Sequence, residues 1–234
     1  MTATHSVPGI AQFVVRCWQA YPSLRQEAQS GALNPLPRSI LRRLSPLAKI
    51  VLQTIAPCIQ AGEQLPAVFS TSHGEIGQSL NMLQELQNGE EISPTAFSLS
   101  VHNAIAGLFS IAYGNQQEIS VVASASGGIV PGFLESLGLL REGHAEVLLV
   151  FYDESLPAFY PTSPYQMTQP HPEALTLKLA ATGEGLAVQL SRLRSTRHDG
   201  EQPLQLTALI RFLQSEQKLL QLGEQNHCWQ WQKT

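Results

Sequence analysis

The segment from Ile119 to Phe151 constrains the fold of this chain more than any other part of the sequence. An apolar, β-branched run, Ile119–Ala123, leads into the small residues Ser124–Gly128. An amphipathic run, Ile129–Leu140, follows, and a second apolar strand pattern covers Ala145–Phe151. The segment therefore predicts a strand, a tight turn, a helix and a second strand, the alternation that is typical of an α/β sheet.

The tight turn of this segment carries Ser126. A strand that turns through glycine into a helix holds the side chain of the turn out of the sheet, at the positive end of the helix. Enzymes place nucleophiles at such turns, but a serine hydroxyl also needs a neighbouring base, for which His73 and His102 are the candidates. The flanking residues do not form the Gly-x-Ser-x-Gly motif of hydrolases. Ser126 is therefore either a nucleophile or a small residue that fills the turn beneath the helix.

The rest of the chain alternates strand and helix patterns. Pro46 is expected near the start of its helix, because proline is excluded from a helix interior. Gly74 is expected in a turn that brings Glu75 to a helix N-terminus. The expected strands are 10–18, 67–71, 174–180, 185–193 and 228–231, and the expected helices are 38–59, 75–86 and 206–220. The strands at 174–180 and 185–193 are predicted to form a hairpin. The alternation over the first 150 residues predicts a sheet with helices on both faces.

Composition argues against several classes of function. A net charge of −4 with scattered Lys and Arg gives no electrostatic footprint for nucleic acid. We find no signal peptide and no apolar run long enough to span a membrane. The cysteines, Cys17, Cys58 and Cys228, are far apart and lack the spacing of a zinc site. We therefore expect a cytoplasmic protein with reduced, partly buried thiols and no metal or cofactor.

A series of short motifs extends from residue 93 to residue 147 in one register. The motifs are Ser93-Pro94, Asn103, Ala106-Gly107, Ser110-Ile111, Gly114, Ser124-Ala125-Ser126 and Gly143-His144-Ala145-Glu146. In this order they resemble the active-site half of a β-ketoacyl synthase, the condensing enzyme of fatty-acid and polyketide synthesis. The resemblance places Ser126 where that family carries its catalytic cysteine. The histidine motifs of the family, which assist decarboxylation of the extender unit, have no counterpart in this sequence.

This resemblance implies a thiolase-like α/β/α layered fold, of which the chain holds only the N-terminal half of the ketosynthase duplication. We expect a single domain over residues 1–234. Its core is expected at 38–151, followed by a connection rich in proline and tyrosine at 153–172. The C-terminal segment, 173–234, is expected to add a hairpin and a helix to this core.

The resemblance also implies a role without catalysis by this chain. Type II polyketide systems pair a complete ketosynthase with a homologue that lacks the cysteine, the chain length factor. This chain resembles a short chain length factor, similar to those of aryl-polyene pathways. The expected assembly is a heterodimer with the complete ketosynthase, and an acyl carrier protein is expected to deliver the intermediates.

The register of the motifs points to five residues as the wall of the partner's acyl pocket: Ala96, Phe97, Ser100, His102 and Asn103. In ketosynthases the matching segment lies against the two-fold axis and helps to close the pocket of the other subunit. Side-chain bulk there would limit product length, because a close-packed cavity responds to a few methylene groups. His102 and Asn103 also have a simpler interpretation, as polar residues at a helix start that are satisfied within the chain.

Two other hypotheses stay open at this point. The chain could be an autonomous serine acyltransferase or hydrolase that uses Ser126. It could also be a scaffold without a ketosynthase partner, although half of a duplicated fold is expected to expose a sheet edge that favours association.

Overall fold

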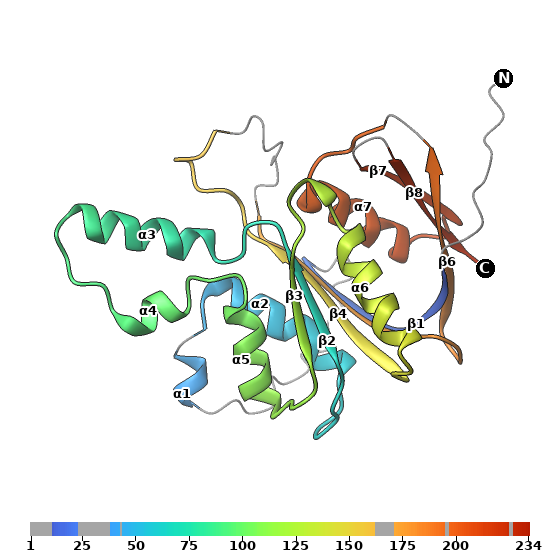
Figure 1. Cartoon of the computed structure of the whole chain (residues 1–234), viewed down its shortest axis with the longest axis horizontal. Helices are drawn as coiled ribbons and strands as arrows, with labels where there is room; N and C mark the ends of the chain where they lie inside the picture. Colours follow the sequence, from blue (N-terminus) through green and yellow to red (C-terminus); the bar gives the residue numbers. More distant parts are fainter. Residues whose placement is uncertain (1–10, 23–37, 43, 162–170, 195–196, 225–226) are drawn as a thin grey trace.

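The computed structural model describes residues 11–22, 38–42, 44–161, 171–194, 197–224 and 227–234. The part of the predicted 153–172 connection from 162 to 170 lies outside these residues. The strands are β1 (Ala11–Tyr21), β2 (Ala67–Thr71), β3 (Ile119–Ala123), β4 (Glu146–Asp153), β5 (Glu173–Ala180), β6 (Leu186–Arg194), β7 (Leu219–Glu224) and β8 (His227–Lys233). In the described chain they form one sheet of eight strands, in the order β3-β2-β4-β5-β1-β6-β8-β7 (Figure 1).

The sheet is mixed. Strand β2 pairs in parallel with β3 and β4, and the remaining neighbours pair antiparallel. The predicted hairpin of 174–180 with 185–193 is wrong, because β1 lies between β5 and β6 and pairs with both. The turn between the two strands was a local signal, whereas β1 supplies a longer ladder from the other end of the chain. The C-terminal hairpin is formed instead by β7 and β8.

The predicted helices are present, two of them with different bounds, and two further helices lie at 94–98 and 104–113. The described helices are α1 (Arg38–Leu41), α2 (Pro46–Ile55), the 3₁₀ turn η1 (Ala56–Cys58), α3 (Ile76–Gln87), α4 (Pro94–Ser98), α5 (Ala104–Tyr113), the 3₁₀ turn η2 (Ala125–Gly127), α6 (Val130–Arg141) and α7 (Gln202–Gln214). The single helix predicted at 38–59 is broken, because Pro46 starts a new helix that Ser45 caps by accepting the Ala48 N–H at 2.8 Å. The helix predicted at 206–220 is displaced to α7, and the alternating residues after it form β7.

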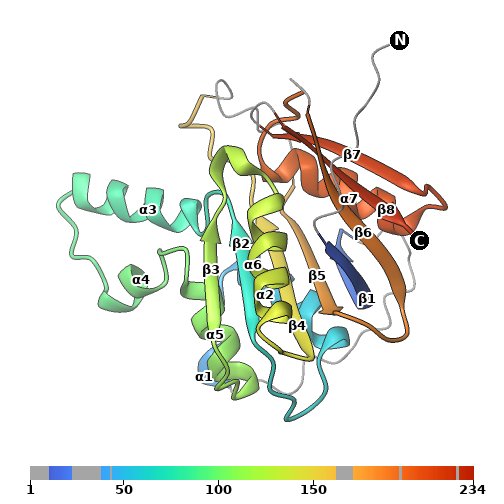
Figure 2. The same ribbon diagram turned by 45° about the vertical axis from the view of Figure 1, so that its right-hand side comes forward.

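Helices cover both faces of the sheet, as the sequence predicted (Figure 2). Strand β4 shows why, because Val147, Leu149 and Phe151 join the cluster beneath α6 and α7. The alternate residues, Leu148 and Val150, join the second cluster, beneath α2 and α5. A strand buried on both faces reads as a continuous apolar run, which is the pattern that Ala145–Phe151 carries.

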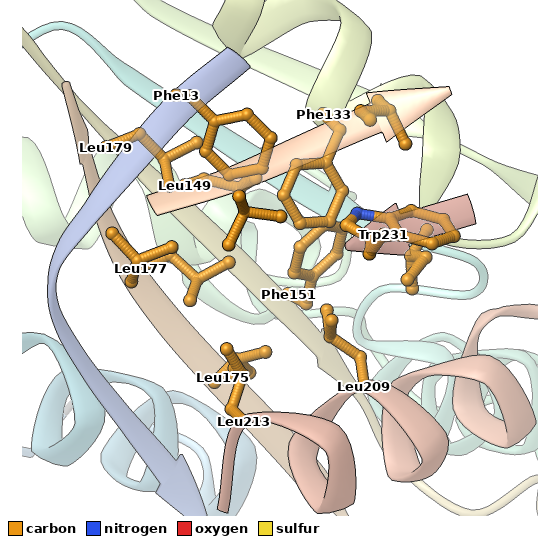
Figure 3. Packing of buried hydrophobic residues seen from close by; sticks show 14 of the residues in the cluster. Phe13, Phe133, Leu149, Phe151, Leu175, Leu177, Leu179, Leu209, Leu213 and Trp231 are labelled. Carbon is orange, nitrogen blue, oxygen red and sulfur yellow. The ribbon is translucent and has the colours of Figure 1, made fainter. Parts of the chain in front are cut away.

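The cluster beneath α6 and α7 is built on aromatic packing (Figure 3). The Phe133 ring of α6 lies 5.7 Å from that of Phe13, 5.5 Å from that of Phe151 and 5.6 Å from that of Trp231. These rings come from α6 and from three strands at distant positions in the sequence. Their contacts therefore join both ends of the chain into one core.

The segment from α3 to α4, residues 76–98, projects away from the sheet at its β3 end, and we call it the arm (Figures 1 and 2). Neither helix of the arm contains a buried residue. Leu83, Leu86 and Phe97 are 57%, 55% and 61% exposed, respectively. Within the described residues, no helix is both long enough and apolar enough to cross a membrane.

Candidate functional site

The predicted turn beside Ser126 is present. Strand β3 runs through the 3₁₀ turn η2 into α6, and Ser126 lies half-buried in that turn, at the N-terminal end of the helix. Gly128 takes a φ of +62° there, a conformation that side-chain-bearing residues rarely adopt. The strand-turn-helix prediction for 119–140 is therefore confirmed.

The amide group of Gln205, from α7, occupies the hollow of this turn. A Cβ atom on Gly128 would lie 2.1 Å from Gln205 Oε1, so a larger residue there would displace the Gln205 amide. Gln205 Oε1 accepts the Ile129 N–H at 3.3 Å, and its Nε2 donates to the carbonyls of Gly200 (3.0 Å) and Gly223 (2.9 Å). The Ile129 N–H, at the start of α6, is thus bonded within the chain. Backbone N–H groups of this kind stabilise the oxyanion in acyl transfer.

A second buried network lies below the turn. The hydroxyls of Ser70 and Ser124 are 2.8 Å apart, and Gln202 Nε2 donates to the Ser70 carbonyl at 2.7 Å. The Ser70 hydroxyl also lies 3.3 Å from Gln202 Oε1. All three side chains are buried, and their hydrogen bonds tie β2 and the turn to α7. Sequence reasoning missed Gln202 and Gln205, because no local pattern links α7 to strands so far away in the chain.

The predicted turn after β2 is confirmed and has an acidic partner. Gly74 has a φ of +60°, and Glu75 directly precedes α3. His73 Nε2 lies 3.0 Å from a carboxylate oxygen of Glu201. The neighbouring Asp153 carboxylate accepts the backbone N–H groups of Ser72 at 2.9 Å and His73 at 3.0 Å. Burial raises the pKa of Asp153 to about 6, against the opposing effect of these hydrogen bonds.

Two further carboxylates hold the base of the arm. Glu75 accepts the Ser45 hydroxyl at 2.6 Å, and Glu154 accepts the Gly77 N–H in the first turn of α3 at 2.8 Å. Burial raises the pKa of both carboxyl groups. Acidic groups favour the positive end of a helix, so these contacts fix the direction in which the arm leaves the body.

The predicted pocket-wall residues lie on the arm and at its return to the body. Ala96 and Phe97 are in α4, and Ser100 is half-buried, with its carbonyl accepting the Ser79 hydroxyl of α3 at 2.9 Å. His102 and Asn103 are exposed at the start of α5. The His102 backbone carbonyl, rather than its imidazole, is tied to the body through the Tyr152 hydroxyl at 3.0 Å.

Two open grooves flank α5. The first has a volume of about 450 Å³ and lies between α4 and α5, lined by Pro94, Thr95, Ser98, Leu99, Asn103, Ala104, Gly107, Leu108 and Ile111. The second, of about 380 Å³, lies between α5 and β3 and is lined by Asn103, Ala106, Gly107, Ile119 and Val121. Asn103 borders both grooves, and Gly107 has open space where a Cβ atom would lie. The surface beside β3 is therefore hollowed as well as apolar.

One group of side chains in the described residues has the composition of a cation site. Glu118, Glu142 and His144 have ligand atoms within 4.8 Å of one another, and His144 Nε2 lies 3.0 Å from Glu118. The two glutamates are exposed to solvent. Exposed acidic groups commonly gather without an ion, so this group alone indicates no metal centre.

Comparisons with known proteins give the fold a context. The family described as "Beta-ketoacyl synthase, N-terminal domain" matches residues 16–232. No curated protein matches the chain. A solved ketosynthase (ApeO) in complex with its chain length factor (ApeC), from Xenorhabdus doucetiae, matches with a TM-score of 0.80 at 22% identity. That match covers 95% of this chain and 99% of the other, so the two are of similar length.

Two other solved structures are similar. The ishigamide ketosynthase/chain length factor has a TM-score of 0.59 at 14% identity, covering 87% of this chain and 73% of that one. A β-ketoacyl synthase from Burkholderia phymatum has a TM-score of 0.52 at 13% identity, covering 76% of this chain and 53% of that one. These matches confirm the predicted thiolase-like α/β fold.

Proposed function

The chain belongs to the β-ketoacyl synthase N-terminal domain family, and on that premise we propose that it is a non-catalytic chain length factor. In this proposal it forms a heterodimer with a complete ketosynthase, which carries the active site. An acyl carrier protein delivers the intermediates of a polyketide, aryl-polyene or fatty-acid-like chain. The observation that carries the proposal is an exposed apolar surface, made by β3 and the arm. It lies beside the turn in which Ser126 occupies the position of a nucleophile.

Strand β3 is the first part of that surface. In the described part of the chain it is an end strand that pairs with β2, so its outer edge offers backbone N–H and C=O groups to another chain. Ile119 and Val121 are only half-buried there and line the groove beside α5. An apolar end strand without protection favours pairing with a second sheet, and the ketosynthase family resemblance implies such pairing across a dimer axis.

The arm is the second part. Leu83, Leu86 and Phe97 are more than half exposed, although leucine and phenylalanine usually lie inside. A two-helix projection that buries none of its own residues gains little stability from packing within this chain. Contact with a partner would bury these side chains, which is the behaviour expected of an interface.

The turn at Ser126 supports a role without catalysis. A serine hydroxyl is a weak nucleophile unless a base activates it. The Ile129 N–H at the start of α6 is bonded to Gln205, and Gln205 fills the hollow of the turn. The ketosynthase partner would therefore supply both the thiol and the histidines of the reaction.

The X. doucetiae match supports the role of a short partner subunit. The chain that matches is nearly the same length as this one, and the structure in which it occurs is a ketosynthase with its chain length factor. We therefore place Ala96, Phe97, Ser100, His102 and Asn103 at the wall of the partner's acyl pocket, as a proposal that rests on their position on the arm and at the start of α5.

Native mass spectrometry of this chain, co-expressed with the ketosynthase encoded nearest to it, tests the proposal. The expected result is a discrete complex with equal copies of the two chains. A chain that remains separate at micromolar concentration, while the ketosynthase forms its own dimer, would contradict the heterodimer.

The alternative, a serine acyltransferase or hydrolase, is favoured by the position of Ser126 alone. Ser126→Ala separates the two, because it removes a single oxygen atom from a half-buried side chain and the alanine variant is expected to fold. We expect product output of the reconstituted pathway to stay within about twofold of wild type, since activity of the complex would not use this hydroxyl. A loss as large as that from omitting the chain would favour the alternative.

A further inference from the structure

Two of the three cysteines, 41 positions apart in sequence, meet on the face of the sheet that α2 and α5 cover. The Sγ atoms of Cys17 in β1 and Cys58 in η1 are 2.9 Å apart, and both thiols are reduced. Formation of a disulfide requires the sulfurs to approach to about 2.05 Å, a shift of less than an ångström. Cys228 is also a free thiol, but it lies in β8.

An irregularity in β1 produces this meeting. Residues two apart in a strand normally face the same side of the sheet, yet Val15 joins the cluster beneath α6 and α7, whereas Cys17 packs against the cluster beneath α2 and α5. The register of β1 against β5 shifts between Val15 and Cys17, which leaves Arg16 as the extra residue of a bulge. The bulge thus directs the Cys17 thiol toward η1, away from the side that the strand pattern predicts.

The surroundings make the two thiols unequal. Cys17 is half-buried, and its thiol also lies 3.5 Å from the Pro57 carbonyl, whereas Cys58 is 3% exposed. The hydrogen bond with Cys58 and the nearby charge of Lys178 lower the pKa of Cys17, against the opposing effect of its burial. The same hydrogen bond, together with burial, raises the pKa of Cys58. The accessible sulfur is therefore the one that becomes a thiolate more readily.

We propose that Cys17 and Cys58 form an oxidisable dithiol, which hydrogen peroxide or an organic hydroperoxide converts into an intramolecular disulfide. Cys17 is the sulfur that the peroxide oxidises, and Cys58 is the resolving thiol. The inference rests on this chain alone and does not depend on the proposed ketosynthase partner.

The chemistry balances in two steps. The Cys17 thiolate attacks one oxygen of the peroxide, the O–O bond breaks, and the leaving hydroxide takes up a proton to become water, or an alcohol from an organic hydroperoxide. Cys17 is then a sulfenic acid. The Cys58 sulfur attacks the Cys17 sulfur, the S–O bond breaks as the S–S bond forms, and the hydroxyl leaves with the thiol proton as water. The dithiol loses two hydrogen atoms, and the peroxide is reduced.

The product would link β1, in the interior of the sheet, to the turn that ends α2. In the reduced chain these elements are held at this position by packing, by the thiol–thiol contact and by the contact of the Cys17 thiol with the Pro57 carbonyl. A covalent link there restrains the first strand of the chain against the helix layer, and a thiol reductant reverses it.

Thiol mapping of the purified full-length chain tests the proposal. The chain is treated with hydrogen peroxide, unfolded, alkylated with N-ethylmaleimide and digested for peptide mass spectrometry. Before oxidation, we expect three alkylated cysteines. Afterwards, we expect alkylated Cys228 and one peptide pair joined through Cys17 and Cys58, which dithiothreitol separates.

Two variants assign the roles. In Cys58→Ser, Cys17 is expected to stop at the sulfenic acid, which dimedone labels, and no linked peptides form. Cys228→Ser is the matched control and is expected to give the same linked pair as wild type. Three alkylated cysteines at peroxide doses that oxidise free cysteine, or a linked peptide that contains Cys228, would overturn the proposal.

Discussion

In the centre of the sheet, β4 buries seven of its eight residues, whereas the twelve residues of α3 include none that is buried. Helix α3 is the more polar of the two segments, but it also carries apolar side chains, among them Leu83 and Leu86. Strand β4 has neighbours on both sides and helices over both faces. Among the described residues, the two helices of the arm pack against each other and are hydrogen-bonded to the rest of the chain at their base, and Leu83, Leu86 and Phe97 stay more than half exposed.

The two regions also differ in the kind of contact that holds them. The body is held by aromatic and aliphatic packing around Phe133, with two buried threonines, Thr54 and Thr176, bridging α2 to β5 at 2.8 Å. The arm is fixed at its base by carboxylates that accept backbone N–H groups and a hydroxyl. The stability that apolar packing provides depends little on pH, whereas the contribution of buried carboxylates depends on it strongly. The two regions should therefore respond differently to mutation and to pH.

The largest effect is expected from truncating matched phenylalanines in the two regions. Phe133→Ala removes a 1% exposed ring from among three others and should lower the free energy of unfolding by about 3–5 kcal/mol. Phe97→Ala, at a 61% exposed position, should change it by no more than about 0.5 kcal/mol. Urea unfolding followed by circular dichroism measures both. Equal losses from the two variants would mean that the arm is part of the folded core.

Titration of the Asp153 carboxyl, at the base of the arm, is expected to change the free energy of unfolding by up to about 3 kcal/mol. Asp153 has a pKa of about 6 in the folded chain and about 4 when unfolded, so the folded chain binds more protons between these values. The free energy of unfolding contributed by this group is therefore greatest below pH 4 and falls as the pH rises toward 6. Urea unfolding at pH 4.5, 5.5 and 6.5 measures the slope.

Asp153→Asn provides the control for that slope, since the amide does not titrate. The variant should show a flatter dependence on pH across the same window, whatever its absolute stability. If the free energy of unfolding of wild type instead rose from pH 4.5 to 6.5, relative to that of Asp153→Asn, the sign assigned to the buried carboxyl would be wrong.

A smaller effect is expected from removing the apolar side chains of α3, and it should appear only in the complex. Leu83→Ser combined with Leu86→Ser should leave the melting temperature of the isolated chain nearly unchanged, because both leucines are more than half exposed. The affinity for the ketosynthase should fall at least about tenfold, or roughly 1.4 kcal/mol. Leu219→Ser, at a 41% exposed leucine in the opposite end strand β7, is the matched control. Equal losses of affinity at the two sites would remove the arm from the interface.

The smallest and most specific effect is expected from Ser100→Phe. Ser100 is half-buried where α4 turns back toward α5, and a larger side chain there would extend into the space assigned to the partner's acyl pocket. The complex should assemble, as native mass spectrometry can verify, and its products should be shorter by at least one extension unit. Unchanged products from a fully assembled complex would exclude Ser100 from the wall.

The sequence alone determined the local elements around Ser126. The run of β-branched residues, the glycines and the amphipathic segment predicted β3, the turn and α6, because each depends on neighbours within a few residues. Pro46 marked the start of α2 for the same reason, since its ring is compatible only with the first turn of a helix. The motif register also identified the family, and with it the layered fold.

Only the tertiary structure decided which distant residues meet. The insertion of β1 between β5 and β6, the filling of the Ser126 turn by Gln205 and the contact of Cys17 with Cys58 each join segments at least 40 residues apart. The last of these depends on a bulge that reverses the side on which a residue lies, which strand periodicity cannot predict. The sequence also could not show that the arm is exposed. The apolar residues of a helix follow the same pattern whether they pack within the chain or against another molecule.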